Sequence, residues 1–236
     1  MSFKGVIEAR CPNGCEVFEV EVWSFIHGDR SPELREAVAA KECNLLICPA
    51  CGAAFFADAP YIYFEAAADI LFFVFPESFQ AEESRWRRKM AEDFKSLKQA
   101  LGDKLPLDLE PEICFGPERL GDLLNEDTYR AEEVEVMEAV AQELGLSLYH
   151  VRPGFARRQG IPASLPCVRA NNGSVTRADL IAGLERLLAA NGRLTAFQSY
   201  LDGLRIAADS ALPPPREEER SAPGTASPGL PSPARS

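Results

Sequence analysis

Histidine is scarce in this sequence: only His27 and His150 occur among its 236 residues. Catalytic zinc sites often use His or Glu ligands and keep one position for water. The scarcity of histidine therefore disfavours a catalytic zinc site. Long apolar runs are missing too, since the most apolar stretch, Ile70–Phe75, is too short to cross a bilayer. The first residues lack the pattern of a secretory signal, and we therefore expect a cytoplasmic protein with no membrane span.

Basic residues are also few, with 25 Lys and Arg against 36 Asp and Glu, a net charge of −11. Residues 1–80 are the most acidic part, with 5 basic and 12 acidic side chains. Proteins that bind nucleic acids need a positive surface to displace counterions from phosphates. The composition therefore disfavours a nucleic-acid-binding function.

The chain changes character twice along its length. Residues 1–80 contain several short runs with the period of β-strands, including Phe18–Ile26, whereas residues 81–212 show mainly helical periodicity. Residues 213–236 hold 7 of the 18 prolines and no aromatic residue, which predicts a disordered tail. Strands followed by helices predict an α+β fold rather than an alternating α/β fold.

Local signals place several helices. Ser31 and Pro32 predict a helix start between two strands, and Trp86, Met90 and Phe94 form an apolar stripe after residue 81. Separate helices are predicted over 117–125 and 131–145. A Thr176/Asp179 capping pair predicts the start of a further helix, and an amphipathic helix follows it.

Four of the seven cysteines stand in two similar brackets, "CPNGC" at Cys11–Cys15 and "CPACG" at Cys48–Gly52. Two cysteines separated by two or three residues can turn both sulfurs toward one ion, and tetrahedral thiolate coordination suits zinc. Proline and glycine in each bracket favour the tight turn that this requires. The spacing predicts a structural zinc site with four cysteine ligands, Cys11, Cys15, Cys48 and Cys51; iron is the other metal to consider.

Other roles for the cysteines remain open at this point. Cys48 and Cys51 could form a thiol-redox pair, although the sequence after them is strand-like rather than helical. His27 could replace Cys15 in a catalytic site, but a position in the turn between strand and helix is the simpler role for it. Reduced core residues without metal are the third possibility, and this role suits the remaining three cysteines, Cys43, Cys114 and Cys167.

The brackets and their surroundings resemble the bacterial and archaeal CpXC-domain family. The match runs through "CPNGC", "SPELREAVAAKECNLLICPACG" and "APYIYFEAAADILFFVFP" and extends more loosely to about residue 145. The first bracket departs from the Cys-Pro-x-Cys pattern by one extra residue. The resemblance implies a zinc-ribbon-like domain and no particular activity. We therefore expect an antiparallel β domain with an inserted helix over 1–80, a mainly helical region over 81–212, of which 81–145 could extend the family module, and the tail over 213–236.

An arginine-rich segment lies between Glu143 and Asp179, where no acidic residue occurs. It could bind an anion or an acidic partner through four arginines, Arg152, Arg157, Arg158 and Arg169. Alternatively, this is a connecting loop whose arginines pair with acidic residues of the same protein, which is the interpretation we favour.

These observations favour a non-enzymatic zinc protein that serves in protein–protein interaction. The second hypothesis is an enzyme, either metal-dependent or a thiol oxidoreductase that uses Cys48 and Cys51. A nucleic-acid-binding zinc ribbon is the third, disfavoured by the net charge.

Overall fold

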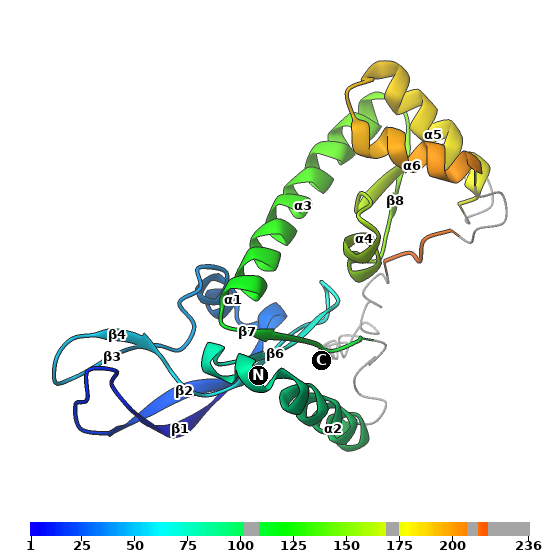
Figure 1. Cartoon of the computed structure of the whole chain (residues 1–236). Helices are drawn as coiled ribbons and strands as arrows, with labels where there is room; N and C mark the ends of the chain where they lie inside the picture. The colour runs from blue at the N-terminus through cyan, green and yellow to red at the C-terminus, as the bar shows by residue number, and fades with distance from the viewer. Residues whose placement is uncertain (102–108, 169–174, 207–211, 217–236) are drawn as a thin grey trace, which may run out of the picture.

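The computed structural model describes residues 1–101, 109–168, 175–206 and 212–216. One long helix joins an N-terminal sheet with its covering helices to a C-terminal group of helices and short strands (Figure 1). The strands are β1 (Phe3–Ala9), β2 (Phe18–His27), β3 (Leu45–Ile47), β4 (Ala54–Phe56), β5 (Tyr61–Glu65), β6 (Ile70–Phe75), β7 (Glu112–Phe115), β8 (Ser147–His150) and β9 (Ser164–Cys167). The α-helices are α1 (Pro32–Ala39), α2 (Glu83–Leu101), α3 (Glu118–Glu143), α4 (Pro153–Gln159), α5 (Arg177–Ala190) and α6 (Thr195–Ile206), and short 3-10 helices cover Gly28–Arg30 and Glu77–Glu82.

The main sheet has five strands in the order β1-β2-β5-β6-β7, and it is mixed. β1 pairs with β2 and β5 with β6 in antiparallel fashion, whereas β2–β5 and β6–β7 are parallel pairs. The α+β class is confirmed, but the expectation of an antiparallel sheet is wrong. Parallel neighbours need a long crossover connection, and the chain supplies two: α1 with the β3–β4 hairpin, and α2.

The centre of the sheet is covered on both faces. All six residues of β6 are buried, so neither face of the strand "ILFFVF" is exposed to solvent. On one face Phe72 packs in a cluster with Val38 of α1 and Leu120 of α3. On the other face Phe73 packs with Trp86 of α2, whose predicted apolar stripe is confirmed. α1, β6 and α2 therefore belong to successive layers around one sheet.

Helix α3 is a single helix of 26 residues, and the prediction of two shorter helices is wrong. The residues between the two predicted helices, 126–130, contain neither glycine nor proline, so nothing interrupts the backbone hydrogen bonds there. Leu124 of α3 is buried in the core of the sheet, whereas Met137 is buried in the C-terminal core. The helix therefore links the two cores.

A polar network fastens α1 and α3 to the edge of this core. The Nε atom of Arg35 donates to both oxygens of the Glu65 carboxylate at 3.2 and 3.3 Å, and the Tyr63 hydroxyl donates to the same carboxylate at 2.5 Å. Arg35 also donates to the backbone carbonyl of Leu124 in α3. Gly28 lies against this network, since a Cβ atom there would stand 2.3 Å from the Tyr63 hydroxyl oxygen.

The C-terminal part packs β8 and β9 against α5, α6 and the end of α3. The Thr176/Asp179 pair forms a capping box at the start of α5, as predicted. The predicted disordered tail is wrong for its first residues, because the Tyr149 hydroxyl donates to the carbonyl of Pro213 and the backbone N–H of Arg216 donates to the carbonyl of His150. The remainder of that tail, 217–236, lies outside the described residues.

The expected domain boundary near residue 80 falls between β6 and α2. Elements after this boundary still belong to the N-terminal sheet, because β7 pairs with β6 and α2 covers one face of the sheet. The division of the chain into separate regions at residue 80 remains a prediction. Within the described ranges, no helix combines the length and the apolar composition needed to span a bilayer.

Replacing Arg35 by alanine should destabilise the protein by about 2 to 3 kcal/mol, since it leaves the buried Glu65 carboxylate without its cation. Arg87→Ala is the matched control, because Arg87 forms an exposed ion pair with Glu83 within one helix, worth about 0.5 kcal/mol or less. Urea unfolding of the two variants measures the difference. Equal unfolding midpoints would show that the network does not hold α3 to the sheet.

Candidate metal centre

The first cysteine bracket forms the turn that follows β1. The backbone N–H of Gly14 donates to the carbonyl of Cys11 at 3.0 Å, and Gly14 has a φ of 75°, which glycine adopts without strain. Cys11 is buried and Cys15 is half-buried. The extra residue relative to the second bracket is thus accommodated within a closed turn.

The second bracket connects β3 to β4. The backbone N–H of Cys48 donates to the carbonyl of Ala53 at 2.9 Å, and the N–H of Gly52 donates to the carbonyl of Cys48 at 2.9 Å. Gly52 has a φ of 73°, again in the left-handed region. Cys48 is buried, whereas Cys51 is exposed at the tip of the turn.

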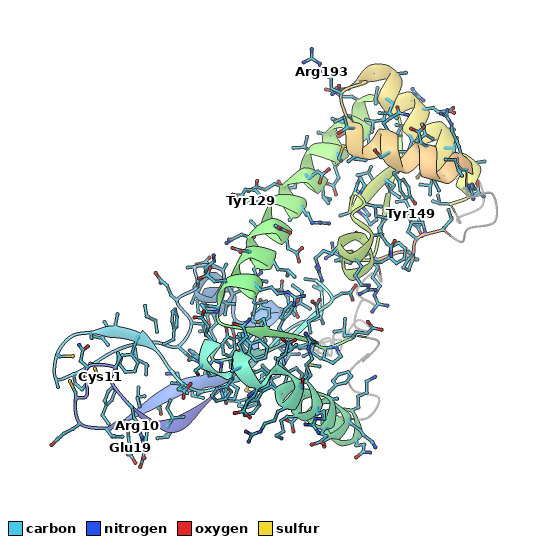
Figure 2. The ribbon with its side chains drawn as sticks, viewed as in Figure 1. Arg10, Cys11, Glu19, Tyr129, Tyr149 and Arg193 are labelled. Carbon is cyan, nitrogen blue, oxygen red and sulfur yellow. The ribbon has the colours of Figure 1, made fainter. Side chains whose placement is uncertain are left out.

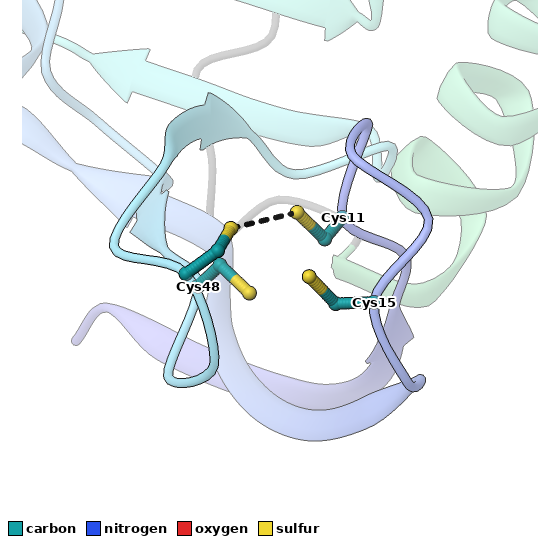
Figure 3. Close-up of side chains that lie close together, drawn as sticks. Cys11, Cys15 and Cys48 are labelled. Atoms are coloured by element: carbon teal, nitrogen blue, oxygen red, sulfur yellow. Dashed lines mark hydrogen bonds between the residues drawn. The ribbon is translucent and has the colours of Figure 1, made fainter.

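The two turns bring all four sulfurs together, as predicted from the sequence. The Sγ atoms of Cys11, Cys15, Cys48 and Cys51 all lie within 4.8 Å of one another, with Cys11 and Cys51 at 3.6 Å (Figure 3). A tetrahedral ion with metal–sulfur bonds of about 2.3 Å would hold its sulfurs about 3.8 Å apart. All four cysteines are free of disulfide bonds. The group therefore has the number, chemistry and spacing of ligands for one metal ion.

Asn13, which the sequence reasoning did not single out, supports the group from the first turn. Its backbone N–H donates to the Cys11 sulfur at 3.4 Å, and its side-chain amide donates to the Cys51 sulfur at 3.5 Å. Hydrogen bonds of this kind favour the thiolate form that binds metals. The position of an asparagine inside the first bracket was the only sequence feature that could have indicated this supporting role.

In the absence of an ion, the thiols differ in acidity. Hydrogen bonds from the backbone of Ala53 and the side chain of Asn13 lower the pKa of Cys51 to about 6. The hydrogen bond with Cys51, followed by that with Cys48, raises the pKa of Cys15 to about 12. For Cys11, the Asn13 N–H lowers the pKa, but burial and its thiol neighbours outweigh it and the pKa is raised. Four thiols at this spacing cannot all ionise unless a cation is present.

The β3–β4 hairpin is a separate small sheet that packs on β1 and β2. Asn44 anchors its base, since its side chain accepts from the N–H of Trp23 at 2.8 Å and donates to the carbonyl of Trp23 at 2.9 Å. A small apolar cluster that includes Val22 and Leu46 fills the interface. The cysteine group closes the same interface at its far end.

The other cysteines and the histidines lie outside the group. Cys43, Cys114 and Cys167 are buried, in agreement with the prediction of core positions, and burial raises the pKa of Cys43 to about 12. His27 ends β2 and contacts Phe64 edge-on, with a ring centroid separation of 5.1 Å. A ring nitrogen of His150 lies 3.0 Å from the Ser164 hydroxyl. Neither histidine is a member of the four-cysteine group.

The arginine-rich segment contains β8, α4 and β9 rather than an irregular loop. Arg152 pairs with Asp69. Arg157 pairs with the half-buried Asp127 at 2.7 Å and donates to two carbonyls of the β5–β6 turn. Arg158 is exposed. No local pattern marked Asp69 or Asp127 as partners, because both are far from these arginines along the chain.

Arg169 lies outside the described residues, so its part in the predicted anion site is not described. Binding of an anion or an acidic partner by this segment stays a prediction, although two of the four arginines already have carboxylate partners in the same chain.

A family model described as CpXC protein matches residues 9–138, more than half of the chain. The chain belongs to the CpXC family. The matched part contains both cysteine brackets and ends near the end of α3, so the CpXC region includes β7 and most of the linking helix. No curated protein and no solved structure matches the chain. Figure 2 places Cys11 at one end of the molecule and Arg193, outside the CpXC region, at the other.

Alkylation of this CpXC protein should distinguish the two sets of cysteines. With metal bound, we expect all seven thiols to react slowly. Immediately after removal of metal, before the region unfolds, Cys51 should react first, since it is exposed and its pKa is lowered to about 6. Mass spectrometry of peptides after timed treatment with iodoacetamide gives the order. Reaction of Cys43 or Cys167 before Cys51 in the folded protein would contradict this arrangement.

Proposed function

We propose that this CpXC protein is a non-enzymatic zinc protein whose four-cysteine site holds a protein-interaction surface in place. The observation that carries the proposal is the meeting of four thiols from two separate turns within 4.8 Å. Four cysteine ligands fill the tetrahedral positions of zinc and leave none open for a substrate or water. Such a site would stabilise the fold.

Zinc is the metal we favour over iron. A tetrahedral set of four sulfurs suits either zinc or an iron centre, so the ligand set alone leaves a choice. Zinc has no redox chemistry and needs only the closed, partly buried ligand set that the two turns provide. Metal analysis of the protein purified without added metal decides between the two.

A thiol-redox function is the alternative that the Cys48/Cys51 pair would support. Redox cysteines of the Cys-x-x-Cys type are activated at the N-terminus of a helix. Here the pair is followed by β4. The acidity of Cys51 arises instead from Ala53 and Asn13, the neighbours expected of a metal knuckle.

The hairpin presents an apolar outer face, which supports a role in protein interaction. Leu45 pairs across the hairpin with Phe56 and Ile47 with Ala54, so these side chains share one face. Leu45, Ile47 and Phe56 are 42%, 69% and 46% exposed. Interface cores are rich in aromatic and large aliphatic side chains, whereas charged side chains are depleted there. Nucleic acid is a poor match for this apolar face and for the acidic sequence around it.

Removing the metal with a chelator should unfold the CpXC region, since structural zinc contributes on the order of 10 kcal/mol to the folding of small domains. Cys48→Ser should have the same effect, because Cys48 is a buried member of the group. Cys167→Ala, in the C-terminal core, should retain one metal ion per chain. Circular dichroism melting with metal analysis tests this, and an unchanged melting temperature in chelator would refute the structural role.

Ile47→Asp should abolish capture of partners from the native host without changing metal content, because it places a charge on the exposed apolar face of the hairpin. Val136→Asp is the matched control, since Val136 is an exposed aliphatic residue of α3 outside the hairpin. Quantitative affinity purification compares the two variants with the unaltered protein. Equal recovery with Ile47→Asp would rule out this face.

A further inference from the structure

A cavity of about 330 Å³ lies where the β3–β4 hairpin meets the ends of β6 and β7. Its walls come from the strand ends of the main sheet, from the connection between β4 and β5, and from the loop that leads into α3. This volume is at the lower end of the range for small-molecule sites in proteins. It is outside the cysteine group, and nothing in the proposed zinc site uses it.

The walls of the cavity are aromatic and its rim is acidic. Phe56, Phe75 and Phe115 line it together with three carboxylates, Asp58, Glu77 and Glu118, and none of the described lining residues is basic. Glu118 is already paired with Lys41. Asp58 accepts a hydrogen bond from the Ser78 hydroxyl at 2.8 Å, and within the described part of the chain neither Asp58 nor Glu77 has an ion-pair partner.

A buried hydroxyl points to a missing polar partner. Tyr61 lines the cavity and is only 7% exposed, yet its hydroxyl forms no hydrogen bond of normal geometry with a described residue. The neighbouring Cys43 thiol, which interacts with it, is a weak partner. Burial raises the pKa of Tyr61, so the hydroxyl stays neutral and its oxygen remains free to accept a hydrogen bond. A buried polar group of this kind normally has a partner, such as a water or a ligand.

We propose that this cavity binds an organic cation, an ammonium or guanidinium group on an apolar stem such as the side chain of Lys or Arg in a partner protein. The stem would pack on the phenylalanine rings, and the cation would meet Asp58 and Glu77. An exposed ring such as that of Phe56 also attracts a cation through its π face. Lys41 provides a precedent within the chain, since its ammonium group binds Glu118 and Asp122 beside the cavity.

The proposal deepens the proposed function and rests on it, because Phe56 belongs both to the cavity and to the exposed face of the hairpin. A partner that covers Leu45 and Ile47 could place a basic side chain in the cavity at the same time. Opposite charges at the edge of an apolar contact fix its orientation and exclude other partners. The acidic rim therefore selects for basic segments.

The test uses the full, metal-loaded chain and amide NMR spectra. The probes are a pentapeptide with one lysine between glycines, the same peptide with norleucine in its place, and spermidine. We expect the lysine peptide to shift the amide signals of Ala57, Ala59 and Gly116 in a saturable way, with a dissociation constant of about 1 mM. The norleucine peptide should bind about tenfold more weakly, since it keeps the stem and lacks the charge.

The double variant Asp58→Asn/Glu77→Gln should weaken binding of the lysine peptide about tenfold. Glu132→Gln/Glu133→Gln removes the same charge from the exposed surface of α3 and should leave the affinity unchanged within about twofold. Phe56→Leu keeps an apolar wall without the ring and should weaken the lysine peptide more than the norleucine peptide. Tighter binding of spermidine than of the peptide would identify a free polyamine as the source of the cation.

Absence of shifts at the three amides, or equal affinity for the lysine and norleucine peptides, would overturn the proposal. So would equal affinity of the double variant and the unaltered protein. Metal analysis of each sample distinguishes failure of the cavity proposal from failure of the zinc proposal. A metal-loaded, chelator-sensitive protein that fails to bind the cation refutes the cavity alone, whereas a metal-free, folded protein that binds it refutes zinc alone.

Discussion

The complete burial of β6 is the constraint on which the rest of the structure depends. A strand that is apolar on both faces must be covered on both faces, and isolated sheets cannot meet that requirement. The chain covers one face with α1 and α3 and the other with α2. Because α3 continues beyond the sheet into the C-terminal core, the packing of one strand also determines where that second core begins.

The hairpin that carries the second cysteine bracket is not part of this sheet and needs its own attachment. Asn44 and a small apolar cluster hold its base and middle, and the sulfurs of Cys11 and Cys51 meet at its tip. A metal ion at the tip would allow all four thiols to ionise and would join the two turns through four strong bonds. The apolar face of the hairpin could then stay exposed, since the hairpin would not depend on burying it.

Much of this arrangement follows from local sequence signals. Paired cysteines with proline and glycine indicated the two cysteine turns, the alternating run Phe18–Ile26 indicated β2, and Thr176 with Asp179 indicated the start of α5. The parallel strand pairs were not predictable in this way, because register between distant strands leaves no local pattern. The partners of Arg152 and Arg157 were missed for the same reason: their carboxylates are Asp69, at the turn before β6, and Asp127, in the part of α3 where a break between two helices was expected.

The position of Phe56 connects the metal centre to binding. Phe56 stands in β4, five residues after Cys51, and its ring borders a cavity whose other aromatic walls belong to the main sheet. These rings lie together with Asp58 and Glu77 only when the β3–β4 hairpin packs in this position on the main sheet. A closed four-cysteine site performs no chemistry on a ligand, but it can determine whether a cavity and an apolar face exist side by side. Under the proposals above, a metal in this site would therefore fix the geometry of a surface that recognises apolar and cationic groups together.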